Sequence, residues 1–320
     1  MGTVVAWYGR DQELEGVARV YSSTLTGGKW TRPRVVADGV QPGGNRVPTW
    51  NPVLFQPKDG PLLLFYRVGP NPREWSGFVK VSADGGLTWS SPVALPEGYL
   101  GPIRTKPVQL GNLDIVMGSS TEHDGWVVHI ERFSFPDQGA VTPVDRWTEM
   151  LAAPSAWSKT EPLHRLRNFA AIQPAILQHD GDLLQILCRT QQKVIAESWS
   201  SDGGLTWSPM VSAGLPNPSA GIDAIRLADG RFVLVSNPTT TGRDELSLFV
   251  SDDGLNWSEV FEFERSVGEF SYPAVIQSRD GSINVTYSVK PNMIKHVRLD
   301  PTLLAGDGFV PMEVVPDVDG

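Results

Sequence analysis

The chain has 320 residues and a mass of 35.0 kDa, and its composition is 40% hydrophobic and 20% charged. These values exclude a disordered protein and allow one large domain or two of ordinary size. The 36 acidic residues outnumber the 27 basic ones, and the net charge of −9 excludes the basic surface of a nucleic-acid-binding protein. The 32 glycines and 26 prolines indicate many tight turns, as in an all-β protein.

The sequence carries no signal for a disulfide, a metal or a cofactor. Its one cysteine, Cys188, lies in an apolar run, where we expect it to be buried. The five histidines lack metal-ligand spacing and no phosphate-binding glycine loop occurs, so we expect no metal and no cofactor.

The sequence also has no apolar stretch of roughly 18 residues, so we expect no membrane span. Residues 1–10 lack the regions of a secretion signal. This predicts a cytoplasmic protein, or a secreted one if the natural N-terminus lies further upstream. Nothing in the sequence indicates the oligomeric state.

In chain order, residues 2–36 come first and resemble one repeat unit without its first strand. Five longer units follow, and each begins with a polar residue before a short apolar run. A turn such as Asp59-Gly60 then leads into a second, β-rich apolar run. The five starts are Trp50–Leu54, Thr105–Gln109, Ile172–Ile176, Ile222–Arg226 and Ser271–Val275. We therefore expect one domain over 1–304 and a C-terminal tail over 305–320 that packs against the first unit or is loose.

A short motif recurs within these units. Ser82–Trp89 and Ser200–Trp207 share the pattern Ser-x-Asp-Gly-Gly-Leu-Thr-Trp, and Ser251–Trp257 is a copy that is one residue shorter. Glycine supplies the positive φ of a hairpin turn and the Asp oxygens can accept hydrogen bonds from turn N–H groups, so the motif predicts a structural hairpin. Tryptophans recur at Trp30, Trp89, Trp147, Trp207 and Trp257. A period of roughly 50–60 residues is typical of propeller blades. The sequence therefore predicts an all-β, six-bladed β-propeller of four-stranded antiparallel blades.

The repeat also predicts where a site would lie. Innermost strands line the channel of a propeller, and the end of an antiparallel second strand lies beside the start of the first. The predicted ring takes Asn51, Lys106, Gln173, Asp223 and Tyr272 from first strands, and Arg67, Ser119, Arg189, Asn237 and Ser288 from second strands. Its two arginines and its lysine favour an anionic ligand, because Arg binds a carboxylate through two parallel hydrogen bonds. Solvation of a water-filled channel mouth is the alternative.

A loop after the third blade's second strand adds two candidates. Glu122 and His123 are placed there as a possible general acid or base, with a solvated turn as the alternative.

The three Ser-x-Asp copies resemble the Asp-box repeats of the sialidase (neuraminidase) superfamily, and Gly268–Val275 resembles its broad sialidase-like branch. The resemblance covers the whole chain and implies a six-bladed propeller. It also implies a Tyr nucleophile that a Glu activates, an Asp acid or base, and three Arg that clamp the substrate carboxylate. Asp boxes are specific for the propeller and not for one activity.

Residue by residue, the resemblance places Tyr272 at the nucleophile and Arg189 at one of the three arginines. Gln173 stands where the activating Glu is expected, and glutamine cannot take a proton from tyrosine. Asn237 stands at a second arginine position, with Arg243 nearby.

The remaining family positions are matched less directly. Arg46-Val47-Pro48 resembles the family's Arg-Ile-Pro motif, one blade later in the chain. No residue is assigned to the Asp.

These observations predict an exo-acting glycosidase on terminal acidic or capped sugars, with an acidic oligosaccharide as its partner. Two alternatives stay open. A polysaccharide lyase that cleaves a rhamnose–glucuronate type of linkage by β-elimination needs no Glu beside the tyrosine, and a glycan-binding propeller needs no catalytic residue at all.

Overall fold

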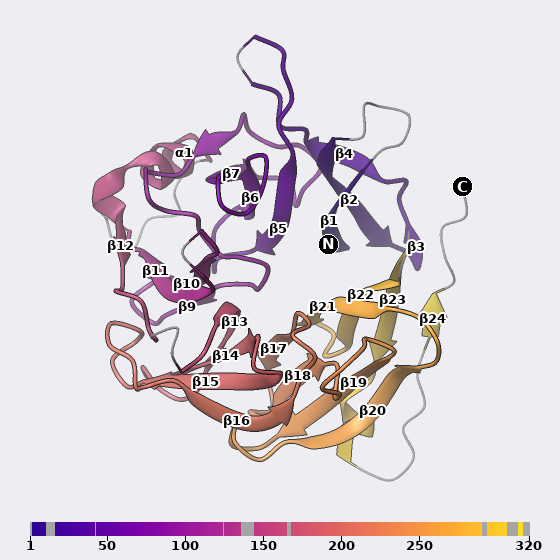
Figure 1. Ribbon diagram of the computed structural model, residues 1–320. Coiled ribbons are helices and arrows are strands. Elements are labelled where there is room, and N and C mark those ends of the chain that lie inside the picture. The colour runs from indigo at the N-terminus through magenta and orange to yellow at the C-terminus, as the bar shows by residue number, and fades with distance from the viewer. Residues whose placement is uncertain are drawn as a thin grey trace. The chain divides into compact units, whose positions relative to one another are not determined.

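The computed structural model describes residues 2–10, 17–41, 43–123, 125–135, 144–164, 168–289, 293–305 and 313–315. Within these residues the chain folds into six four-stranded antiparallel sheets (Figure 1). Three belong to an N-terminal unit, Met1–Pro162, and three to a C-terminal unit, Leu163–Gly320. The sheets are the blades of a β-propeller, so the predicted fold class is confirmed.

The first sheet of the N-terminal unit runs in the order β1-β2-β3, and β4 also pairs with β2. Its strands are β1 (Thr3–Arg10), β2 (Ala18–Thr26), β3 (Lys29–Trp30) and β4 (Arg34–Ala37). The turn between β2 and β3 has positive φ at Gly27 and Gly28, as a two-residue hairpin requires. Later sheets have their Asp-box turns between the third and fourth strands, so β1 and β2 correspond to second and third strands.

The other two sheets of this unit share a core. The second sheet contains β5 (Thr49–Phe55), β6 (Leu62–Val68), β7 (Ser76–Ser82) and β8 (Val93–Ala94). The third contains β9 (Val108–Gln109), β10 (Ile115–Thr121), β11 (Val127–Phe133) and β12 (Trp157–Lys159), with α1 (Val144–Ala152) and the 3-10 turn η1 (Pro154–Ala156) before β12. Phe65, Met117 and Phe133 are buried together. Trp147, from the predicted tryptophan series, lies on α1 and stacks on Phe133 with ring centroids 6.5 Å apart.

The C-terminal unit has three sheets in simple chain order. They contain β13 (Ala171–Gln178), β14 (Leu184–Thr190), β15 (Val194–Ser200) and β16 (Val211–Pro216); β17 (Asp223–Arg226), β18 (Phe232–Ser236), β19 (Glu245–Ser251) and β20 (Ser258–Arg265); and β21 (Phe270–Gln277), β22 (Ile283–Val289), β23 (Met293–Leu299) and β24 (Glu313–Val315). A 3-10 turn, η2 (Pro301–Ala305), follows β23. Cys188 on β14 is buried as expected. The short strand β24, from the segment we assigned to a tail, pairs with β23.

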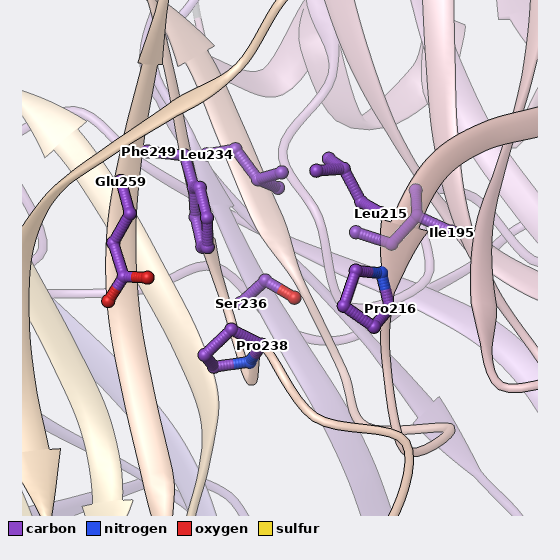
Figure 2. A pocket seen from close by; sticks show the side chains of 8 residues that line it. All are labelled: Ile195, Leu215, Pro216, Leu234, Ser236, Pro238, Phe249 and Glu259. Atoms are coloured by element: carbon purple, nitrogen blue, oxygen red, sulfur yellow. The ribbon is translucent and has the colours of Figure 1, made fainter.

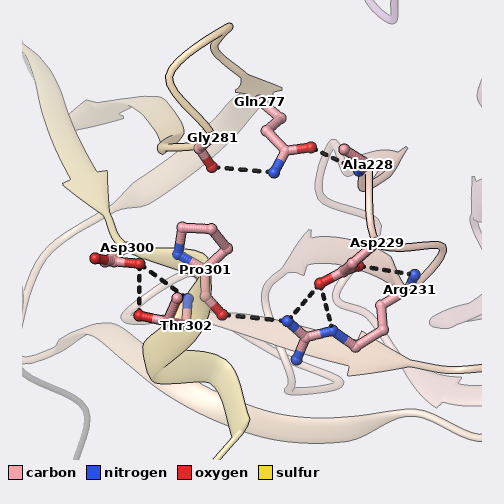
Figure 3. Close-up of polar contacts among 8 residues, drawn as sticks. All are labelled: Ala228, Asp229, Arg231, Gln277, Gly281, Asp300, Pro301 and Thr302. Carbon is pink, nitrogen blue, oxygen red and sulfur yellow. Dashed lines mark hydrogen bonds and ion pairs between the residues drawn. The ribbon is translucent and has the colours of Figure 1, made fainter.

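Polar side chains join the last two sheets of this unit (Figure 3). Gln277 on β21 accepts a hydrogen bond from the N–H of Ala228 at 2.7 Å and donates one to the Gly281 carbonyl at 3.0 Å. Arg231 binds the Asp229 carboxylate at 2.7 Å and donates to the Pro301 carbonyl at 3.1 Å. These bonds fix the turns at this end of the two sheets.

The Asp boxes are hairpins held by their own side chains. Asp84 accepts hydrogen bonds from the Thr88 N–H at 2.8 Å, the Thr88 hydroxyl at 2.6 Å and the Ser82 hydroxyl at 2.8 Å. These bonds, the Thr88 hydroxyl first, lower the pKa of Asp84 to about 2. Asp202 makes the same set with Thr206 and Ser200. The boxes therefore hold the fold, as the sequence predicts, and their carboxylates are engaged.

Candidate active site

The first strands of three sheets share a backbone irregularity at the predicted ring positions. The pairing with the second strand is interrupted after Trp50, Ile172 and Ser271, and each interruption spans one polar or aromatic residue and a proline. The residues before the prolines, Asn51, Gln173 and Tyr272, have φ of 45°, 57° and 55°. Positive φ is rare for residues with a side chain, and such conformations cluster at functional sites. The bulges change the direction in which these three side chains point, relative to a regular strand.

Register confirms that the start of each first strand lies beside the end of the second. Trp50 is opposite Arg67, Ile172 is opposite Arg189, and Ser271 is opposite Ser288. The predicted first-strand residues Asn51, Gln173 and Tyr272 each come directly after the first residue of these pairs, so they lie next to the second-strand residues sixteen positions later in the sequence. The predicted ring residues differ in how deeply they are buried: Arg67 is fully buried, whereas Tyr272 is 37% exposed.

Tyr272 belongs to a cluster with two charged groups. The Arg243 guanidinium lies over the Tyr272 ring, 5.3 Å from its centroid. Arg243 also forms an ion pair with Glu269, with Nη1 and Oε1 3.1 Å apart. All three side chains are partly exposed. An accessible phenol, a cation and a carboxylate are thus brought together at the start of β21.

Backbone contacts hold the start of β21 in place. The Phe270 N–H donates to the Arg243 carbonyl at 2.7 Å, so the cluster's arginine and tyrosine segments are joined directly. Asn237, fully buried at the end of β18, donates from Nδ2 to the Phe270 carbonyl at 2.8 Å and to the Glu245 carbonyl at 2.5 Å. Asn237 therefore holds the backbone at the start of β21, two residues before Tyr272.

Other predicted residues of this unit are mostly enclosed. Arg189 is 8% exposed and donates to the Ser219 carbonyl at 2.8 Å, and Gln173 is 6% exposed. Asp223 is buried, and its carboxylate accepts the Val275 N–H of β21 at 2.8 Å. Asp223 thus ties two first strands together.

In the N-terminal unit, the predicted residue Arg67 is buried and lies within the electrostatic influence of a buried carboxylate, Glu131. The Arg67 side chain donates to the Pro102 carbonyl, while its Nε and Nη1 have no hydrogen-bond partner among the described residues. Burial lowers the pKa of Arg67 to about 9, and the negative charge of Glu131 opposes this change. Glu131 is itself buried and accepts the N–H groups of Leu100 at 3.0 Å and Gly101 at 2.6 Å. Its carboxylate thereby fixes the loop that contains Pro102, whose carbonyl accepts the hydrogen bond from Arg67.

The remaining candidates of this unit are nearer to solvent. Asn51 and Lys106 are half-buried, and Arg46 is exposed and paired with Asp38 at 3.6 Å. Glu122 is half-buried and His123 exposed, directly after β10. In the described residues no group of three or more His, Cys, Asp or Glu side chains has an arrangement that could hold a metal ion.

Three residues of these clusters are not predicted as site residues by the sequence. Arg243 stands out there only as a neighbour of Asn237, and its pairing with Glu269 cannot be read from the sequence because a loop brings the two together. Glu131 is not assigned either. The signal that was available is the short separation of Glu269 and Tyr272, three residues apart at the start of one strand.

Comparison with known proteins gives a consistent family and fold. A family model described as a BNR repeat-like domain matches residues 2–285. The fold is similar to that of the Hadza microbial sialidase Hz136, with a TM-score of 0.70 and 16% identity, over 89% of this chain and 60% of that chain. An intramolecular trans-sialidase from Ruminococcus gnavus has a TM-score of 0.68 and 14% identity, with coverage of 95% and 93%.

A protein of unknown function from Dyadobacter fermentans is also similar, with a TM-score of 0.68 and 18% identity over 92% of this chain and 90% of that one. This chain spans 60% of the length of the Hadza sialidase. No curated protein matches. In the described part of the chain, no helix has the length and apolarity to cross a membrane. At these identities the likeness to solved structures shows the fold.

Proposed function

Since the chain belongs to the family of BNR repeat-like domains, we propose that it is a carbohydrate-active enzyme, an exo-acting glycosidase that removes a terminal acidic sugar with Tyr272 as its nucleophile. The observation that supports this most is the cluster of Tyr272, Arg243 and Glu269 on a bulged first strand. The left-handed backbone conformation of Tyr272 costs free energy. Because the Tyr272 side chain is partly exposed, core packing does not explain this cost.

The cluster supplies the parts of a two-step displacement. The Tyr272 oxygen attacks the anomeric carbon, the bond to the leaving oxygen breaks, and the phenol proton passes to a base. Gln173 cannot accept that proton, so we assign this role to Glu269, which shares Arg243 with Tyr272. The leaving oxygen takes up a proton from solvent water. A second water molecule then attacks the anomeric carbon, the bond to the Tyr272 oxygen breaks, and the phenol regains a proton as the sugar is released. Arg243 stabilises negative charge that develops on the phenol oxygen.

The acidic group of the substrate needs a cation. Arg189 lies beside Gln173 at the end of β14, and its guanidinium would turn from its contact with the Ser219 carbonyl to meet the substrate. An arginine binds a carboxylate through two parallel hydrogen bonds, which suits a sialic or uronic acid. Two proteins of similar fold, the Hadza microbial sialidase and the Ruminococcus gnavus trans-sialidase, support the choice of an acidic sugar.

One observation favours a lyase as second candidate. Gln173 occupies the first-strand position at which a carboxylate is expected for hydrolysis. In β-elimination a base removes the proton at C5 of a uronate, the C4–O bond breaks and an unsaturated sugar forms. That step needs a cation at the carboxylate and a single base, and Arg243 with Tyr272 would supply them.

Substitution Tyr272→Phe tests the catalytic role. We expect turnover of an acidic glycan substrate to fall about 100-fold or more, because the attacking oxygen is removed, while binding of the substrate changes less than about threefold. Tyr8→Phe is the matched control, since Tyr8 is 41% exposed and also lies on a strand. Turnover by Tyr272→Phe at the wild-type rate would contradict the proposal.

A further inference from the structure

A cavity lies in the C-terminal unit, and the residues of the tyrosine cluster do not line it. Its volume is about 210 Å³. Ile195 of β15 and Leu215 of β16 form one side, and Leu234 of β18 and Phe249 of β19 form the other. Figure 2 shows these side chains facing each other across the cavity, with Ser236 between the two groups and Glu259 beside Phe249.

The inner wall of the cavity is apolar and fixed. Ile195 and Leu234 are fully buried, and both belong to the same hydrophobic core as Phe249. Ser236, also buried, accepts a hydrogen bond from Asn217 Nδ2 at 3.1 Å. Because these side chains are held by the core, the apolar wall is formed before any ligand arrives.

The rim carries one negative charge. Glu259 is exposed on β20, directly opposite Phe249 in the register of the sheet. Its Oε1 accepts the Ser247 hydroxyl at 2.7 Å, and no lysine or arginine of the described residues pairs with it. An apolar wall with an uncompensated carboxylate at its edge complements a ligand that has an apolar body and one positive charge.

We propose that this cavity is a binding site for a compact aromatic amine. The ring would lie between Leu215 and Phe249, and the ammonium group would meet the Glu259 carboxylate. The volume is below the roughly 300–1,000 Å³ of pockets for drug-sized ligands, so the ligand is limited to a single ring with a short amine arm. This site does not depend on the proposed glycosidase activity.

Binding of benzylamine and benzyl alcohol, followed by NMR titration of the folded chain, tests the proposal. We expect a millimolar Kd for benzylamine and binding of benzyl alcohol at least threefold weaker, because only the amine meets the carboxylate. Glu259→Gln should remove this difference. Glu262→Gln is the matched control on the same strand, since Glu262 is exposed and does not line the cavity.

Filling the cavity gives an independent readout. Leu215 is half-buried against the core, and Leu215→Trp should fill the cavity and abolish binding of both ligands. Leu215→Phe is the smaller substitute if the first variant does not fold. Equal Kd values for the two ligands in the wild-type chain would overturn the proposal, and so would unchanged benzylamine binding in the filled variant.

Discussion

His296 makes folding sensitive to pH at a single residue. It is buried on β23, and its Nε2 lies 2.9 Å from Oδ1 of Asn284. Burial, with the nearby charge of Arg298, lowers the pKa of His296 from 6.5 to about 4. The unfolded chain therefore binds a proton at a higher pH than the folded chain, and stability that is present above about pH 6.5 is lost as the pH falls towards 4.

We expect the free energy of unfolding to fall by about 1–2 kcal/mol from pH 7 to pH 5 on account of His296. The variant His296→Gln should lose less stability over the same interval, by about that amount. Urea unfolding at both pH values measures this. His179, whose pKa is also lowered by burial, contributes equally to both proteins and cancels. Identical pH dependence in the two proteins would count against the buried, neutral histidine.

Glu131 is the second residue whose environment predicts a measurable change in stability when it is substituted. It accepts backbone N–H groups from Leu100 and Gly101, its Oε1 lies 3.1 Å from Nε2 of His129, and its negative charge acts on the buried Arg67. Glu131→Gln removes that buried charge from all of these contacts, and we expect a loss of about 3 kcal/mol in the free energy of unfolding. Glu161→Gln, at an exposed position, should change it by less than about 0.5 kcal/mol. Similar denaturation midpoints for the two variants would contradict a stabilising role of the Glu131 charge.

At the scale of the elements, the bulged first strands carry the functional argument. Asn51, Gln173 and Tyr272 take positive φ just before a proline, a combination that L-residues avoid. The sequence revealed the repeated polar-Pro pairs and the pairing of strand starts with strand ends. It did not reveal the bulges, since an x-Pro pair is compatible with either an edge strand or a bulge.

Asn51 allows the bulge to be tested away from the proposed chemistry of Tyr272. Glycine adopts φ of 45° without steric cost, so Asn51→Gly should change the free energy of unfolding by less than about 0.5 kcal/mol. Asn51→Val should cost about 1–2 kcal/mol, because a β-branched residue is strained in the left-handed region. Thermal or urea unfolding of both variants measures the difference. Equal stabilities would mean that β5 runs straight through this position.

At the scale of the whole molecule, the repeats in the sequence predicted more of the structure than individual residues did. The repeated units and the tryptophan period predicted the six sheets and their antiparallel order, which the structure has. Each of the three Asp boxes was recognisable because it is a self-contained hairpin with its own hydrogen bonds. Trp147 departs from the pattern, since it lies on α1 and fills the core of the third sheet from outside the strands.

Burial of the predicted site residues was the part that the sequence could not supply. A repeat places Arg67, Asp223 and Asn237 along a strand, but their depth follows from neighbours that are distant in the chain, such as Glu131 for Arg67 and Val275 for Asp223. Bulges also break the alternation that would otherwise tell inward from outward side chains. The cluster of Arg243, Glu269 and Tyr272 emerges only once the loop after β18 is placed beside β21.

The most direct test of the account is the mass of the products formed from acidic glycans. The wild-type chain would be incubated with sialosides and with rhamnose- or arabinose-capped glucuronides, and the Tyr272→Phe variant would serve as the blank. We predict a pair of products whose masses sum to the substrate plus one water, absent from the blank. A pair that sums to the substrate alone, with an unsaturated uronate, would identify the lyase. Binding without any product would contradict an enzyme and leave a glycan-binding propeller.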